Sequence, residues 1–253
     1  MVSSGACLGG DAYDHLLRLG FVPRSPTMKK SGEAGPDFCI VSQEQTIWIE
    51  AVTPSPEGIP ASYLSPPKKG VVQFRPVLDE EPLMRWTSAL SDKCQKLEAD
   101  KRGGIIGDDK NCTIIAVNAC RLHDWRPNEL GSSGFPFAVE AVFPIGHIAL
   151  PVPMDGRPNA EPANIPRFQI RKPNNASVRT DNFLNPKYKT VSALLGCHHK
   201  YMMNVNYATT GRSTLTLVHN PLAAIPLPRG ILGVEGEYVA EEAGDYYILR
   251  RVP

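Results

Sequence analysis

Apolar and polar positions follow regular patterns most clearly in the first half of the chain. Residues 36–41 and 46–52 predict two strands of a hairpin, joined by the turn-like segment SQEQ. Both faces of the second strand are mostly apolar, which is typical of a central strand covered on both sides. The other elements predicted in this half are a helix over 11–20, a helix over about 81–102 that ends at two glycines, and a strand over 112–119.

The second half of the chain has weaker patterns. Residues 53–80 are rich in Pro, Ser and Gly and predict a long loop, as an insertion or a flap. Residues 151–189 carry many Pro, Asn and Arg and predict irregular chain. Three strand-like segments are predicted at 188–197, 213–221 and 245–252.

The order of these elements predicts an α/β (α+β) fold. Helix, strands, helix and strand follow one another in residues 1–150, which we expect to form the core. Residues 151–253 are expected to form a C-terminal elaboration packed on that core, or part of the same domain. Residues 234–245 are acidic and predict a surface stretch.

Composition restricts the class of protein. The chain has 253 residues, of which 42% are hydrophobic and 21% charged, with a net charge of +1. It is long enough to bury a core, and no global charge indicates nucleic acid or membrane. No apolar run approaches the roughly 20 residues of a membrane helix, and a cytoplasmic location is expected. The six cysteines form no C-x-x-C pair, which favours buried thiols.

Two acidic residues of the predicted hairpin are the first candidate site. Glu50 lies in the middle of an apolar strand, where an unpaired carboxylate costs several kcal/mol, on the order of 3, so a partner must offset its burial. Asp37 enters the neighbouring strand, and a hairpin brings the two acids close. Paired carboxylates favour Mg²⁺ or Mn²⁺. The alternative is that Asp37 caps a turn and that Glu50 pairs with an arginine.

A lysine interrupts the apolar stripe of the predicted helix over about 81–102. Lys93 takes a position where the helical spacing calls for an apolar residue, so it either extends past its neighbours to solvent or meets an internal negative charge. Arg85 and Lys96 lie at the edge of the stripe, where they would face a polyanion or solvent. The stripe comprises Leu83, Trp86, Leu90, Lys93 and Leu97.

The segments GPDF and WIEAV, separated by nine residues in residues 35–52, resemble the PD-(D/E)XK, restriction-endonuclease-like nuclease superfamily. The resemblance implies a core of helix, three-stranded meander, helix and strand, with a central mixed sheet flanked by helices. It also implies Asp37 and Glu50 as metal ligands. The motif lysine is replaced by Val52, and because this superfamily can supply the lysine from another element, Lys93 is the natural substitute.

The expected function is therefore that of a Mg²⁺-dependent endonuclease acting on nucleic acid, with DNA as the first candidate. Asp37 and Glu50 would hold the ion, and Lys93 would serve the attacking water or the phosphate. Lys68 and Lys69 would contact nucleic acid or belong to a solvated loop. Val52 favours the alternative of a nuclease fold that has lost catalysis and acts as a nucleic-acid or protein binding module. A third alternative is an interaction protein whose acids only pair with arginines, and a homodimer is left open.

Overall fold

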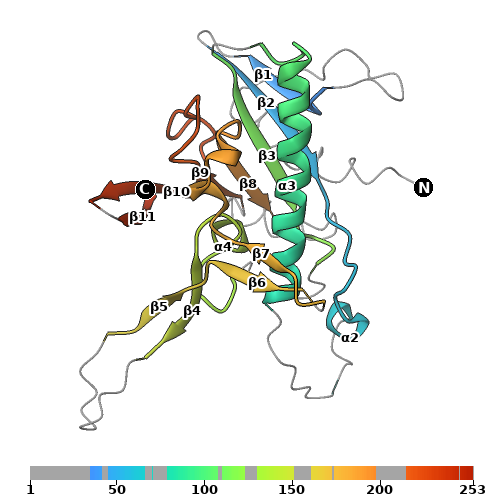
Figure 1. Ribbon diagram of the computed structural model, residues 1–253, viewed down its shortest axis with the longest axis vertical. Helices are drawn as coiled ribbons and strands as arrows, with labels where there is room; N and C mark the ends of the chain where they lie inside the picture. The colour runs from blue at the N-terminus through green and yellow to red at the C-terminus, as the bar shows by residue number, and fades with distance from the viewer. Residues whose placement is uncertain are drawn as a thin grey trace.

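A seven-stranded mixed sheet runs through the protein, with strands in the order β1-β2-β3-β8-β9-β10-β11 (Figure 1). The computed structural model describes residues 35–41, 45–65, 70, 79–107, 110–122, 130–150, 161–172, 174–197, 215–244 and 246–252. The predicted helix over 11–20 and the lysines Lys68 and Lys69 lie outside these described residues.

The first half of the sheet is built from a hairpin and a parallel crossover. Strands β1 (Phe38–Val41) and β2 (Thr46–Val52) pair antiparallel. The chain then passes through α2 (Ala61–Leu64) and α3 (Glu80–Arg102) to β3 (Cys112–Asn118), which is parallel to β2. The predicted hairpin, long helix and following strand are thus confirmed.

The second half of the chain completes the same sheet. Strand β8 (Ala193–Cys197) pairs parallel to β3, and β9 (Thr216–His219) pairs antiparallel to β8. Strands β10 (Gly236–Ala243) and β11 (Tyr246–Val252) then form the far edge. The fold is α+β, and the division at residue 150 separates strands that lie in one sheet.

Two predictions for this half need correction. The acidic segment 234–245 is mostly strand β10, in which Glu237 and Val239 are buried, whereas Glu235 and Glu242 are exposed as expected for a surface stretch. The strand predicted over 188–197 begins only at Ala193, since the 3₁₀ turn η2 (Pro186–Tyr188) precedes it.

Small elements pack below the main sheet, as Figure 1 shows. The segment expected to be irregular contains short strands in its described part, which pair locally rather than with the large sheet. These elements are α4 (Phe137–Glu140), the pair β4 (Ile145–Ala149) and β5 (Ala163–Pro166), the pair β6 (Gln169–Arg171) and β7 (Ser177–Arg179), and the 3₁₀ turn η1 (Asn182–Leu184).

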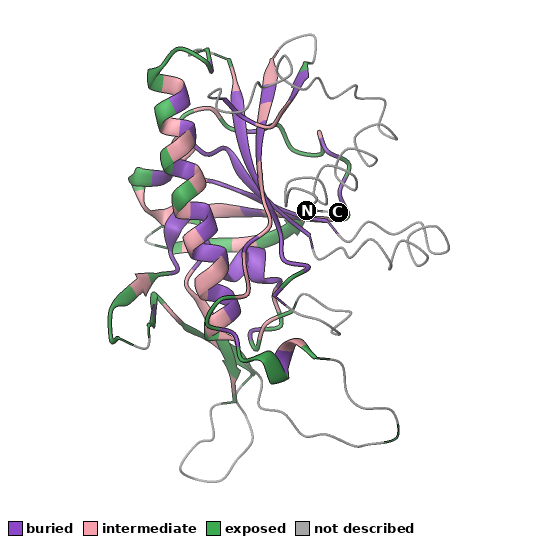
Figure 2. Ribbon diagram, turned by 90° about the vertical axis from the view of Figure 1, so that its right-hand side faces the viewer, coloured by how far each residue is buried: buried purple, intermediate pink, exposed green. Residues whose placement is uncertain are grey.

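The apolar stripe of α3 covers one face of the sheet. Leu83, Trp86, Leu90 and Leu97 are all fully buried against residues of β3, β8 and α4, as the stripe predicts. Figure 2 shows this division along α3, with buried turns toward the sheet and exposed turns away from it. The opposite face of the sheet is covered by residues from the segment 225–234.

Two further expectations concern the described residues as a whole. The cysteines found there are all free and buried, which confirms the interpretation of small buried thiols for these positions: Cys39, Cys94, Cys112, Cys120 and Cys197. No helix in the described ranges is long and apolar enough to span a membrane.

Candidate functional site

Glu50 is a buried acid on the sheet face that α3 covers. Its side chain is 1% exposed, and both of its carboxylate oxygens accept hydrogen bonds from lysines of that helix. Lys93 Nζ lies 2.6 Å from Oε1, and Lys96 Nζ contacts Oε2. A spacing of three residues places both lysines on one side of the helix. Lys93 therefore meets an internal negative charge, the second of the two outcomes considered from the sequence.

Asp37 lies beside Glu50 at the start of the hairpin. The β1–β2 register pairs Phe38 with Ile49, so extending it by one position sets Asp37 opposite Glu50. The Asp37 amide donates to the Ile49 carbonyl at 3.1 Å, and Asp37 Oδ2 accepts from the Ala51 amide at 2.8 Å. Asp37 thus bonds to the backbone of the neighbouring strand β2 and also lies next to the buried acid.

The Lys96 ammonium is surrounded by three oxygen-bearing groups. Besides contacting Glu50, it donates to the Gly35 carbonyl at 2.6 Å and lies 3.6 Å from Asp100 Oδ2. Asp100 is 4% exposed, and its Oδ2 has no hydrogen-bond partner among the described residues. Sequence reasoning did not single out Asp100, although its position four residues after Lys96 was a usable signal.

Two other positions named from the sequence lie outside this cluster. Arg85 donates from Nε to the Glu57 carbonyl at 2.5 Å, so it holds the loop before α2 and does not contact the two acids. Val52, at the usual position of the motif lysine, packs against the apolar core between α3 and the sheet.

The donor set suits a hard divalent cation, but its oxygens are engaged. Carboxylate oxygens are the ligands that Mg²⁺ and Mn²⁺ prefer. In the described part of the chain, no group of three or more His, Cys, Asp or Glu side chains is arranged to hold a metal ion. Because both oxygens of Glu50 accept from ammonium groups, a divalent cation that binds this carboxylate is repelled by two neighbouring positive charges.

Glu140 is a second fully buried acid, with partners of another kind. Ser133 Oγ donates to its Oε1, and Arg167 Nη2 lies 2.5 Å from its Oε2. Burial raises the pKa of the Glu140 carboxyl, while the bonds from Ser133 and Arg167 act in the opposite direction. Ser133 lies in the turn that precedes α4. An arginine-paired acid of this kind is the structural alternative that the sequence left open for Glu50.

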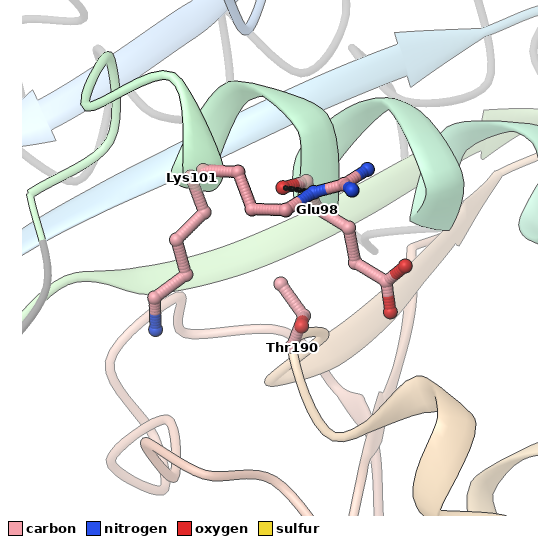
Figure 3. Close-up of a pocket in the computed structure, with 4 residues that line it drawn as sticks. Glu98, Lys101 and Thr190 are labelled. Carbon is pink, nitrogen blue, oxygen red and sulfur yellow. Dashed lines mark hydrogen bonds between the residues drawn. The ribbon is translucent and has the colours of Figure 1, made fainter.

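A pocket of about 570 Å³ lies at the end of α3, apart from the two acids. Figure 3 shows Lys101 and Glu98 extending on either side of Thr190, which belongs to the turn before β8. Arg102 also lines this pocket, so its described wall carries two cations and one carboxylate.

No family model, curated protein or solved structure matches the chain.

Proposed function

We propose that the protein is a metal-dependent nuclease that hydrolyses nucleic-acid phosphodiester bonds, with a restriction-endonuclease-like core formed by the hairpin, α3 and β3. Asp37 and Glu50 would hold Mg²⁺ or Mn²⁺, and Lys93 would take the role of the motif lysine. The observation that carries this proposal is the 2.6 Å contact between Lys93 Nζ and the buried carboxylate of Glu50, which lies opposite Asp37.

The bound ion, Lys93 and Asp37 would each have a separate role in phosphodiester hydrolysis. A bound divalent ion would polarise a phosphate oxygen and lower the pKa of the attacking water. Lys93 is 24% exposed, so its ammonium can orient that water or neutralise charge on the phosphate while Glu50 holds it in place. The bond from the Ala51 amide fixes the orientation of the Asp37 carboxylate.

The proposed substrate is nucleic acid, with DNA tested first. Lys101 and Arg102 follow Lys96 by about one and a half turns of α3, so phosphates on either side of the cleaved bond would reach them. Contacts of this kind neutralise phosphates and weaken as salt increases. Because the net charge is only +1, binding would depend on such local cations rather than on a global field.

One observation favours a second candidate function. Both oxygens of Glu50 are satisfied by lysines, and Val52 stands where the motif lysine is expected. The same arrangement would serve a nuclease fold that has lost catalysis and only binds nucleic acid or protein. The two functions differ in whether the wild-type protein cleaves a phosphodiester in the presence of a divalent ion.

The test is nucleic-acid cleavage in Mg²⁺ and in Mn²⁺ with plasmid DNA, single-stranded DNA and RNA. Asp37→Asn and Glu50→Gln should each lower the cleavage rate by about 100-fold or more, because each removes a charge that stabilises the reaction. Asp92→Asn, an exposed change on the same helix, is the matched control and should cleave normally.

Two results would decide against the proposal. Normal cleavage by Asp37→Asn and Glu50→Gln, with folding verified by circular dichroism, would remove these acids from the active site. Absence of cleavage by the wild-type protein with every substrate and both metals, together with retained binding of nucleic acid, would support the binding module instead.

A further inference from the structure

The Lys96 ammonium occupies the part of the candidate metal site that has the most oxygen atoms around it. We propose that Lys96 competes with the divalent ion for Glu50, and that Asp100 receives the Lys96 ammonium when the ion binds. This inference rests on the proposed function, because it describes how metal would enter that site. It adds a residue, Asp100, that neither the motif nor the apolar stripe indicates.

The surroundings of Lys96 Nζ are those of a cation site. The Gly35 carbonyl lies at 2.6 Å, the Glu50 Oε2 oxygen is in contact, and Asp100 Oδ2 lies at 3.6 Å. The Gly35 carbonyl and the Glu50 carboxylate are hard oxygen donors of the kind that coordinate Mg²⁺ and Mn²⁺, while Asp100 is left for the ammonium. An ammonium and a divalent ion that both contact Glu50 Oε2 repel each other, so binding of one weakens binding of the other.

Asp100 Oδ2 can accept a hydrogen bond from the Lys96 ammonium. Its side chain is 5% exposed, and its Oδ2 has no hydrogen-bond partner in the described part of the chain. A buried carboxylate oxygen without a partner is unfavourable, so this oxygen stands to gain a hydrogen bond. A shift of Lys96 Nζ by about 1 Å would turn the 3.6 Å contact into a charge-assisted bond of ordinary length.

Lys93 lacks this second partner. Its ammonium has one ionic contact in the described residues, with Glu50 Oε1, whereas that of Lys96 has two, with Glu50 and Asp100. If Lys96 leaves Glu50 it keeps one ionic contact, with Asp100, whereas Lys93 would keep none among the described residues. Metal entry should displace Lys96 and leave Lys93 in place, which separates the roles of two neighbouring lysines.

The charges support this exchange. Glu50 and Asp100 balance Lys93 and Lys96, and Asp37 adds one negative charge beside them. The cluster therefore attracts a cation before substrate arrives. With a divalent ion bound it would carry one excess positive charge, which suits an anionic phosphodiester. A lysine that must be displaced lowers the apparent affinity for metal, so activity would respond to metal concentration.

The experiment measures Mn²⁺ binding by calorimetry and by the electron paramagnetic resonance of free Mn²⁺, without substrate. Lys96→Met should bind Mn²⁺ about 10-fold more tightly than the wild type, a coupling of usual size. Asp100→Asn should bind it about 10-fold more weakly, since the acceptor of the displaced ammonium loses its negative charge. Lys96→Gln repeats the first test if the methionine variant is unstable, and Lys172→Met, at an exposed lysine outside the cluster, should leave the affinity unchanged.

The possible outcomes separate the inference from the proposed function. Equal Mn²⁺ affinity in the wild type and both Lys96 variants would overturn the competition and leave the nuclease standing. Unchanged affinity in Asp100→Asn would overturn the role of Asp100. Absence of Mn²⁺ binding in the wild type and in Lys96→Met would overturn the metal site itself. Tighter binding in Lys96→Met that is lost in Lys96→Met/Glu50→Gln would support the whole scheme.

Discussion

Removal of Arg167 tests whether Glu140 is a structural acid that depends on its arginine. Arg167→Met keeps much of the aliphatic side chain and deletes the guanidinium that lies 2.5 Å from Glu140 Oε2. Glu140 is 0% exposed and the Arg167 side chain 16%, so water cannot easily replace the lost partner. The buried Glu140 carboxylate would then keep its hydrogen bond from Ser133 but would have lost its arginine partner.

The magnitude follows from that burial. Breaking a buried ion pair by removing one partner costs about 3–5 kcal/mol, because the other charge stays buried without compensation. A domain of this size loses roughly 2–4 °C in melting temperature for each kcal/mol, so Arg167→Met should melt about 6–20 °C below the wild type. The double variant Arg167→Met/Glu140→Gln should recover much of this loss, since no charge then remains.

The loss should also depend on pH. Burial raises the pKa of Glu140, and loss of Arg167 removes an influence that lowers it, so the pKa in the folded variant rises further. Between the unfolded and the folded pKa the folded state binds more protons than the unfolded state, and stability therefore falls as pH rises through this interval. The deficit of Arg167→Met against the wild type should be full above the variant's folded pKa and should shrink on acidification.

The assay is urea unfolding followed by tryptophan fluorescence, at about pH 8 and about pH 5, for the wild type and both variants. Comparing each variant with the wild type at the same pH cancels the titration of other groups. A deficit below about 1 kcal/mol at the higher pH would show that Glu140 does not depend on Arg167. A deficit of equal size at both pH values would show that the loss has another cause than the Glu140 charge.

Two further predictions concern the core around α3. In Gly196→Ala, the new Cβ would lie 2.7 Å from Ala138 Cβ and 2.9 Å from the Trp86 ring, so overpacking should cost about 1–3 kcal/mol in urea unfolding, and an unchanged midpoint would contradict this packing. Burial raises the pKa of the Cys94 thiol to about 12, so this cysteine should resist alkylation in the native protein at about pH 8 and react only after unfolding. Mass spectrometry that finds Cys94 alkylated in the native protein as fast as in urea would contradict its burial.

The local patterns of the sequence were sufficient for the elements around the site. The stripe of α3 could be predicted because four large apolar residues recur at helical spacing, and Gly103 ends the helix with its amide donating to the Ala99 carbonyl. The hairpin could be predicted because apolar strands flank a polar turn. Lys93 could be recognised because a charged residue interrupts an otherwise apolar stripe.

Long-range pairing set the features that the sequence did not indicate. Segment 234–245 looks like a surface stretch because its many acids suggest solvent, yet β9 and β11 pair with it and its alternate residues turn inward. Glu237 is tolerated there because His219 lies 2.6 Å from its Oε1 and the Gly230 amide donates to it. His219 is distant from Glu237 in the sequence and Gly230 lies in a loop, so no local sequence pattern identifies these two partners.

The two buried glutamates show that the kind of side chain paired with a buried acid indicates its role better than its burial does. Arginine forms planar, pre-organised bonds, and Arg167 holds Glu140 where little water reaches either group. Lysine carries a compact charge on a flexible chain, and the lysines beside Glu50 are 24% and 34% exposed. The partners of Glu50 can therefore move into solvent or, for Lys96, toward Asp100, at a smaller cost. An acid whose partners can leave is available to a ligand, so Glu50 rather than Glu140 is the position from which metal binding should be sought.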